Sequence, residues 1–306
     1  MAGQDLILVG APVDSGKRRR GCLMGPDAFR TAGLAEALRD LGHRVQDVGN
    51  VQLEAHSAQA HPKLHELAQT IGWTKALSDC AAASLRNGVP LFLGGDHALS
   101  LGTVHGAMRH AASVDRPLFV LWLDAHSDFH TPETTQSGNL HGTPLGYVTG
   151  RAGFEGFPTL PYALPHENVA IIGLRSVDPA ERAALQATNI QRVDMRQVDE
   201  TGIARPLTAF LDRVAGANGL LHVSLDVDFL DPAVAPAVGT TVPGGATIRE
   251  AHLVMEMLHD SGLLTSLDLV ELNPFLDERG KTAQVMVDLA ASAFGRRVFD
   301  RPTRAY

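Results

Sequence analysis

The chain has 306 residues, of which 44% are hydrophobic and 20% are charged. This composition is typical of globular proteins with a sizeable core, and it excludes the disordered, collagen-like and membrane-embedded classes. With 34 acidic and 26 basic residues, the formal net charge is -8. This negative charge does not favour nucleic acid or an anionic membrane as a partner, and we expect the protein to bind a small molecule instead. We expect a single domain over residues 1–306.

The cysteine content and the first residues bear on the cellular compartment. Two cysteines, Cys22 and Cys80, are too few for a disulfide framework and favour a reducing compartment. The first ten residues lack the basic segment and long apolar stretch of a signal peptide. No segment approaches the roughly 18 apolar residues of a membrane-spanning helix. These patterns predict a cytoplasmic protein.

Short apolar runs alternate with longer segments at helical spacing along the whole chain. In chain order we expect a strand at 6–9, helices near 26–41 and 61–87, strands at 89–93 and 118–123, and an irregular segment at 128–167. A strand at 169–173, a helix near 205–215, a strand at 220–225, a helix near 247–261, a strand at 264–269 and a helix near 281–294 follow. This alternation predicts a parallel sheet with helices on both faces. The segment 128–167 is rich in Gly, Pro, Thr and Ser, and a loop of that length is usually functional or disordered.

Polar side chains follow several of the expected strands, at the edge where α/β sheets bind ligands. The segments in question are Gly94-Gly95-Asp96-His97, Asp124-Ala125-His126-Ser127-Asp128, Asp226-Val227-Asp228 and, after the last strand, Glu271. Because side chains alternate faces along a strand, Asp124, His126 and Asp128 project to one side, and Asp226 and Asp228 do likewise. Two strand ends thus direct five groups that bind metals into one space.

Carboxylates this close together repel one another unless cations neutralise them. A mixture of carboxylate and imidazole suits manganese, zinc or iron, and this much negative charge favours two divalent ions over one. Two ions about 3.5–4 Å apart share a water molecule and make it hydroxide near neutral pH. The alternative for either D-x-D pair taken alone is a turn or a helix cap.

The segment at 10–17 is similar to a phosphate-binding loop but departs from it. Five residues rather than four separate its glycines, and Arg18 stands where a Ser or Thr would bind magnesium. For the basic run at 17–20 we expect a solvated loop. The competing interpretation is a rim that attracts an anionic group of the substrate.

Four segments together resemble the successive signatures of the ureohydrolase superfamily, the manganese enzymes that include arginase and agmatinase. They are residues 94–97, 124–128, 224–232 (Ser-Leu-Asp-Val-Asp-Phe-Leu-Asp-Pro) and 271–274 (Glu-Leu-Asn-Pro). The resemblance extends from residue 10 to residue 295. It implies a three-layer α/β/α fold of the arginase type and two Mn2+ ions per chain. The implied ligands are His97, Asp124, Asp128 and Asp226 for one ion, and Asp124, His126, Asp226 and Asp228 for the other, with Asp124 and Asp226 bridging.

The resemblance also implies how a substrate is held. Residues 135–142 (Thr-Gln-Ser-Gly-Asn-Leu-His-Gly) are similar to the arginase segment that contacts the α-carboxylate, and residues 173–179 to the segment whose aspartate pairs with the α-ammonium. The implied substrate contacts are His130, Thr135, Ser137, Asn139, Asp178, Glu181 through a water, and Thr240. The implied catalytic residues are Asp128 and His141, which transfer protons, and Glu271, which holds the guanidinium. Two positions depart from the pattern, with His130 in place of a common Asn and Ser176 in place of a common acidic residue.

The activity implied by this resemblance is hydrolysis of L-arginine to L-ornithine and urea. Two alternatives remain open, namely another ureohydrolase acting on guanidinobutyrate, agmatine or a formimino amino acid, and an inactive relative that serves as a binding subunit. Each of these residues also has a purely structural alternative. In that interpretation residues 137–139 only form a turn, Asp178 only caps a helix and His141 is a structural histidine of the loop. The resemblance suggests a homotrimer or hexamer, with residues 296–306 in its contacts.

Overall fold

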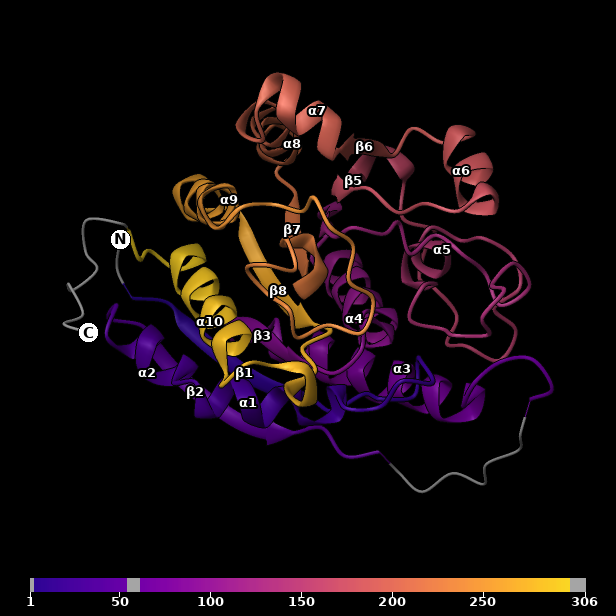
Figure 1. The fold of residues 1–306 in the computed structure, drawn as a ribbon, viewed down its shortest axis with the longest axis horizontal. Coiled ribbons are helices and arrows are strands. Elements are labelled where there is room, and N and C mark those ends of the chain that lie inside the picture. The colour runs from indigo at the N-terminus through magenta and orange to yellow at the C-terminus, as the bar shows by residue number, and fades with distance from the viewer. Residues whose placement is uncertain (1–2, 54–60, 298–306) are drawn as a thin grey trace.

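A parallel eight-stranded sheet forms the centre of the computed structural model, which describes residues 3–53 and 61–297 (Figure 1). The strands are β1 (Asp5–Ala11), β2 (Arg44–Asn50), β3 (Val89–Gly94), β4 (Leu118–Leu123), β5 (Val169–Leu174), β6 (Gln191–Asp194), β7 (Leu220–Asp226) and β8 (Leu264–Val270). Their order across the sheet is β2-β1-β3-β8-β7-β4-β5-β6, and each neighbouring pair is parallel. The six expected strands are confirmed.

Ten α-helices accompany the sheet within the described ranges. They are α1 (Gly25–Thr31), α2 (Leu34–Arg39), α3 (Leu67–Ser84), α4 (Ser100–Ser113), α5 (Pro144–Val148), α6 (Pro179–Gln186), α7 (Met195–Thr201), α8 (Ala204–Gly216), α9 (Ile248–Ser261) and α10 (Lys281–Ala293). Short 3₁₀ turns lie at η1 (Cys22–Met24), η2 (His97–Leu99), η3 (His166–Asn168), η4 (Val227–Phe229) and η5 (Pro274–Leu276). No helix in this part of the chain has both the length and the apolar character that crossing a bilayer requires.

The sheet separates two hydrophobic cores. In β4, Phe119, Leu121 and Leu123 belong to one core, while the alternate residues Leu118, Val120 and Trp122 belong to the other. The first core includes residues of α1, α2 and α7 to α10, and the second includes residues of α3 to α6. Strand alternation therefore buries both faces of the sheet, and the expected three-layer α/β/α fold is confirmed (Figure 1).

The structure differs from the expected elements in a few places with clear causes. The edge strands β2 and β6 were not expected, because their sequences are polar and they bury no residue in β2 and one residue in β6. Helices α4, α5 and α7 were also not expected, and α6 was anticipated only in the alternative that makes Asp178 a helix cap. The helix expected near 26–41 is divided into α1 and α2 by Gly33, whose φ of 84° ends helical geometry. The helix expected from residue 61 begins at Leu67, after Glu66 with its left-handed φ of 43°.

The order of the strands explains where a site can form. The four adjacent central strands β3, β8, β7 and β4 each end at one of the segments singled out in the sequence. At their carboxyl ends stand His97, Glu271, Asp226 and Asp124, respectively. Segments that are distant in the sequence therefore meet at one edge of the sheet.

Candidate active site

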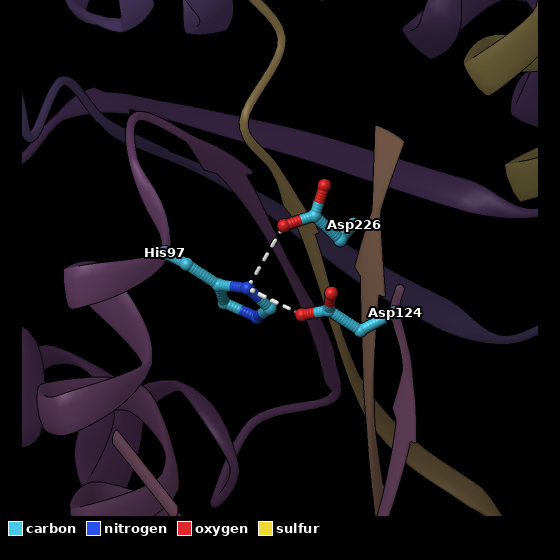
Figure 2. Close-up of side chains that lie close together, drawn as sticks. All are labelled: His97, Asp124 and Asp226. Carbon is cyan, nitrogen blue, oxygen red and sulfur yellow. Dashed lines mark ion pairs between the residues drawn. The ribbon is translucent and has the colours of Figure 1, made fainter. Parts of the chain in front are cut away.

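A buried imidazole lies at the centre of the polar cluster on this edge. His97 begins η2, and its Nδ1 atom lies 3.0 Å from Asp226 Oδ2, 3.0 Å from Asp128 Oδ2 and 3.2 Å from Asp124 Oδ2. All four residues are buried. Figure 2 shows the His97 nitrogen facing the Asp124 and Asp226 carboxylates. The strand ends thus direct three carboxylates at one ring nitrogen.

A second group adjoins the first and shares Asp124 with it. His126 Nδ1 lies 3.1 Å from Asp228 Oδ2 and 3.4 Å from Asp124 Oδ1. The potential ligand atoms of Asp124, His126 and Asp228 lie within 4.8 Å of one another, as do those of His97, Asp124 and Asp226. The six side chains expected as metal ligands therefore form one continuous cluster.

The first aspartate of each motif uses its two oxygens differently. Asp124 Oδ1 accepts a hydrogen bond from the His126 backbone N–H at 2.6 Å, and Asp226 Oδ1 accepts one from the Asp228 backbone N–H at 2.7 Å. The Oδ2 atom of each aspartate faces His97. In Asp226 the turn contact and the contact with His97 thus use different oxygens, whereas Asp124 Oδ1 makes the turn contact and also lies 3.4 Å from His126 Nδ1.

The carboxylates strongly perturb the proton equilibria of the cluster. Burial and the charges of Asp228 and Asp124 raise the pKa of Asp226 well above its ordinary value. Burial, with Asp124, raises the pKa of Asp128 to about 6, although His97 opposes the rise. Burial alone would lower the pKa of His97, but the surrounding carboxylates raise it well above its ordinary value. Without another cation, this cluster must take up protons to relieve its repulsion.

These residues fit a site for divalent metal ions. The buried His97 Nδ1 makes no hydrogen bond of normal geometry, although three carboxylate oxygens surround it. An imidazole nitrogen among carboxylate oxygens is a donor set that suits manganese, zinc or iron. A buried group of like charges in this arrangement is stable when cations lie between them.

Two residues that support the cluster were not predicted. Trp122 stacks on His97 with ring centroids 4.2 Å apart, and its Nε1–H donates to Asp124 Oδ2 at 3.0 Å. Ser224 Oγ lies 2.8 Å from His97 Nε2. Ser224 precedes Asp226 by two positions and so shares its face of β7, a signal that was present in the sequence.

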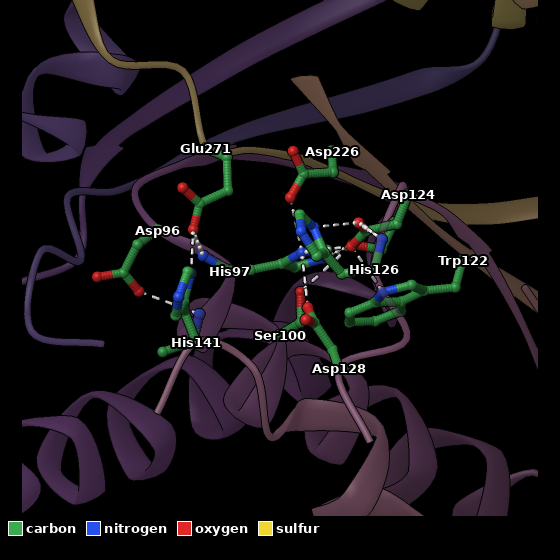
Figure 3. A network of polar contacts seen from close by, with 12 residues as sticks. Asp96, His97, Ser100, Trp122, Asp124, His126, Asp128, His141, Asp226 and Glu271 are labelled. Atoms are coloured by element: carbon green, nitrogen blue, oxygen red, sulfur yellow. Dashed lines mark hydrogen bonds and ion pairs between the residues drawn. The ribbon is translucent and has the colours of Figure 1, made fainter. Parts of the chain in front are cut away.

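Glu271 lies beside this cluster but behind the cavity. Its Oε1 atom accepts a hydrogen bond from the His97 backbone N–H at 2.8 Å and lies 3.0 Å from His141 Nδ1 (Figure 3). The carboxylate is 1% exposed and forms an ion pair with Lys17. Glu271 and Asp128 adopt left-handed φ angles of 67° and 45°, and such strain is concentrated at functional sites.

The basic run at 17–20 divides into two parts. Residues 18–20 are exposed, as a solvated loop requires. Lys17 is 2% exposed, so the expectation of a solvated loop is wrong for this residue. The reason is its ion pair with Glu271, a partner 254 positions away in sequence. Local charge pattern carries no signal of such a partner.

The cluster forms the floor of a cavity of about 270 Å³. Its lining includes His97, His126, Asp128, His130, Thr135, Gln136, Ser137, Asn139, His141, Gly142, Ser176, Asp178, Glu181, Asp226, Asp228 and Thr240. This set contains seven of the eight residues expected to contact substrate and lacks Glu271, which was expected to hold the guanidinium. Two expected site residues, Asp124 and Glu271, are outside the set, and both lie beneath the lining.

One wall of the cavity carries a histidine and two carboxylates in contact. His130 Nε2 lies 2.7 Å from Asp178 Oδ2 and 3.6 Å from Glu181 Oε2. Asp178 Oδ1 caps α6 by accepting from the backbone N–H groups of Ala180 and Glu181. Asp178 is therefore a helix cap through one oxygen and faces the cavity wall through the other. Glu181 Oε1 also accepts from Ser127 Oγ at 2.6 Å, which fixes the loop after β4.

A second wall of the cavity consists of short polar side chains. Thr135 Oγ1 lies 3.3 Å from Ser137 Oγ, which accepts from the Asn139 backbone N–H at 3.2 Å. Asn139 Oδ1 accepts from the Arg18 backbone N–H at 3.3 Å. Thr240 Oγ1 donates to Asp228 Oδ2 at 3.1 Å, so it links this wall to the floor. These contacts show turn-forming hydrogen bonds in a segment that also lines the cavity.

Comparison with known proteins agrees with this geometry. The model of the arginase family matches residues 4–295 of the chain. The arginase of Brucella melitensis is 60% identical over 302 residues, which cover 98% of this chain and 99% of that protein. The arginase of Agrobacterium fabrum is 59% identical over 302 residues, which cover 98% of this chain and 93% of that protein. The crystal structure of arginase from Bacillus subtilis superposes with a TM-score of 0.87 at 38% identity, covering 96% of this chain and 99% of that one. The chain belongs to the arginase family.

Proposed function

We propose that this chain hydrolyses the guanidinium group of L-arginine to L-ornithine and urea, using two Mn2+ ions held by the floor of the cavity. Membership of the arginase family supports the reaction, a hydrolysis of the guanidino C–N bond. The observation that carries the metal site is the buried His97 Nδ1, which faces three carboxylate oxygens and makes no hydrogen bond of normal geometry.

The ligands in this proposal are those implied by the sequence. One ion takes His97, Asp124, Asp128 and Asp226, and the other takes Asp124, His126, Asp226 and Asp228. The chemistry that such a pair of ions supplies is a hydroxide nucleophile near neutral pH. The chain's own residues bind the substrate and move protons.

Asp128 and His141 are the proton-transferring groups in this scheme. Asp128 lines the cavity, and we assign to it the proton that the leaving nitrogen receives. His141 lines the cavity, and we assign to it the exchange of protons with solvent. Glu271 supplies the negative charge on the guanidinium side.

The two walls of the cavity bind the α-carboxylate and the α-ammonium of the substrate. Ser137, Asn139 and Thr135 offer short polar groups to the α-carboxylate, and His130 stands beside them. Asp178 offers a carboxylate to the α-ammonium, with Glu181 acting through a water. Thr240 is assigned to the guanidinium end because it donates to Asp228.

The test is urea release from L-arginine, agmatine and guanidinobutyrate by the manganese-loaded protein, combined with metal analysis. We expect two manganese ions per chain and the highest kcat/KM for arginine. Full activity with one ion at saturating manganese contradicts the two-ion site. A higher kcat/KM for either of the other compounds assigns the chain to another ureohydrolase activity.

We further propose that residues 1–306 form one catalytic domain, that the chain acts in the cytoplasm and that it assembles as a homotrimer or hexamer. Both cysteines are free, which supports a reducing compartment. The tail expected to contribute to these contacts is 296–306, of which residues 298–306 lie outside the described residues. Light scattering of the purified protein tests the assembly, and a monomer contradicts it.

A further inference from the structure

Lys17 is a buried cation for which neither the sequence motifs nor the proposed reaction has a role. It lies in the loop between β1 and η1 and is 2% exposed. Its ammonium contacts Glu271 Oε2. Because a buried charge without a partner is costly, this ion pair explains how Lys17 remains in the interior.

The contacts of Glu271 show what this ion pair controls. Oε1 receives the His97 backbone N–H at 2.8 Å and faces His141 Nδ1 at 3.0 Å. Oε2 receives the Lys17 ammonium and lies 3.9 Å from Cys22 Sγ. Both oxygens are thus occupied, and Figure 3 shows Glu271 directed toward His97 and His141. Lys17 is the cation that holds Oε2, while Oε1 faces His97 and His141.

The backbone beside Lys17 is joined to the loop that carries His141. The Gly16 carbonyl accepts hydrogen bonds from the backbone N–H groups of Leu140 at 2.6 Å and His141 at 3.0 Å. The Gly16 N–H donates to Asp96 Oδ2 at 2.8 Å. A Cβ at Gly16 would lie 2.4 Å from Asp96 Oδ1, so only glycine permits this approach. These main-chain hydrogen bonds therefore fix the position of the Lys17 segment relative to the His141 loop.

From these contacts we propose that Lys17 is a positioning residue for the reaction. Its ammonium holds the Glu271 carboxylate, and the carboxylate accepts the Nδ1–H of His141, so that the other ring nitrogen of His141 serves the cavity. This inference rests on the proposed function, because it assigns Lys17 an effect on the proton transfer of His141. The charged groups that face His141 are Glu271, Lys17, Asp128 and Asp96.

Removal of the Lys17 charge has a defined electrostatic consequence. The charge of Glu271 then lacks its ammonium partner and acts on His141 alone, which favours the imidazolium form. A single charge several ångströms away in a protein interior shifts a titration by about one pH unit or more. The kcat–pH profile should therefore move to higher pH. KM for arginine is measured separately, because Lys17 does not line the cavity but its partner Glu271 is assigned to the guanidinium.

The experiment compares Lys17→Met, Lys17→Gln and Lys17→Arg with wild-type protein, all loaded with manganese. Gln keeps a donor for Glu271 without the charge, and Arg keeps the charge. Lys75→Met is the matched control, because it neutralises an exposed lysine on α3. Bound manganese per chain and circular dichroism are measured on every variant.

We expect Lys17→Gln and Lys17→Met to lower kcat about tenfold or more and to shift its profile by about one unit toward alkaline pH. Lys17→Arg should retain the wild-type profile. A profile for Lys17→Gln that matches Lys75→Met overturns the inference, and it does so even where Lys17→Met fails to fold. Absence of urea release by the wild-type protein is a different result, which overturns the proposed function itself.

Discussion

The floor and the walls of the cavity use the same kinds of side chain in opposite ways. On the floor, three carboxylates face the single His97 Nδ1 atom, which makes no hydrogen bond of normal geometry. On the walls, polar groups pair with each other, as His130 does with Asp178 and Thr135 with Ser137. The carboxylates of the floor therefore require added positive charge. The polar groups of the walls already have partners, and a bound substrate would replace those partners with its own groups. The first arrangement favours ion binding and the second favours selectivity.

The largest effect in this comparison is expected from the floor. Asp124→Ala or Asp226→Ala removes a carboxylate that we propose as a bridge between the two ions. We expect bound manganese to fall and kcat to drop by about 10³-fold or more, as the loss of several kcal/mol of metal stabilisation implies. Metal analysis and urea release measure both quantities. Asp212→Ala, on the exposed side of α8, is the control and should change neither. Wild-type manganese content in Asp226→Ala would remove this residue from the ligand set.

The second effect concerns His141, which lies between floor and walls. Burial alone would lower the pKa of His141, but its contact with Glu271 raises it above the ordinary value. Because the pKa of His141 is raised, its neutral form, which can accept a proton, becomes dominant only at a higher pH than for an ordinary histidine. Activity should therefore rise into the alkaline range. We expect His141→Asn to lower kcat by about 10²-fold or more with little change in KM. His110→Asn on α4 serves as the control, and an unchanged kcat in His141→Asn would exclude it from proton transfer.

The main feature of the floor was predictable from the sequence, because parallel strands bring their carboxyl ends to one edge and so place Asp124 near Asp226. The expected strand alternation is wrong beyond those ends, since β4 ends at Leu123, Asp128 has a left-handed φ of 45° and Asp228 lies in η4. Turn and ligand were both plausible for Asp124 because its side chain makes both kinds of contact, with Oδ1 accepting from the His126 backbone N–H and Oδ2 facing His97 Nδ1.

What the sequence could not predict depends on contacts between distant segments. Lys17 opens a run of basic residues and is indistinguishable from its exposed neighbours until the fold brings Glu271 to it. The edge strands β2 and β6 carry no apolar alternation strong enough to predict, because neighbours cover only one side of them. Ser224 is an intermediate case. The sequence predicts that it shares a face of the strand with Asp226, but it does not predict its contact with His97.

The walls should control the choice of substrate. We expect the protein to prefer L-arginine to agmatine and to guanidinobutyrate by about 10²-fold in kcat/KM, because each analogue leaves polar wall groups without a partner. Asp178→Ser retains an oxygen that can cap α6 but removes the carboxylate from the cavity. This variant should raise KM for arginine and reduce the preference over guanidinobutyrate.

A matched control for Asp178 exists on the neighbouring helix. Asp194 caps α7 through its Oδ1 atom, which accepts from the Gln197 backbone N–H at 2.8 Å, and it does not line the cavity. Asp194→Ser should leave the preference unchanged. If Asp178→Ser also leaves it unchanged, the α-ammonium is bound elsewhere.

The smallest effect is expected beneath the floor, where Ser224 determines the orientation of His97. Its hydroxyl lies 2.8 Å from Nε2, the ring nitrogen opposite the carboxylates. Groups in this position fix the ring and tune its affinity for metal, so we expect Ser224→Ala to weaken manganese binding by about 10- to 100-fold. Ser292→Ala is the matched control, since it removes another buried hydroxyl that contacts a histidine, His252 Nδ1, at 2.9 Å. Equal manganese affinity in the two variants, measured by titration calorimetry, would mean that stacking on Trp122 alone orients His97.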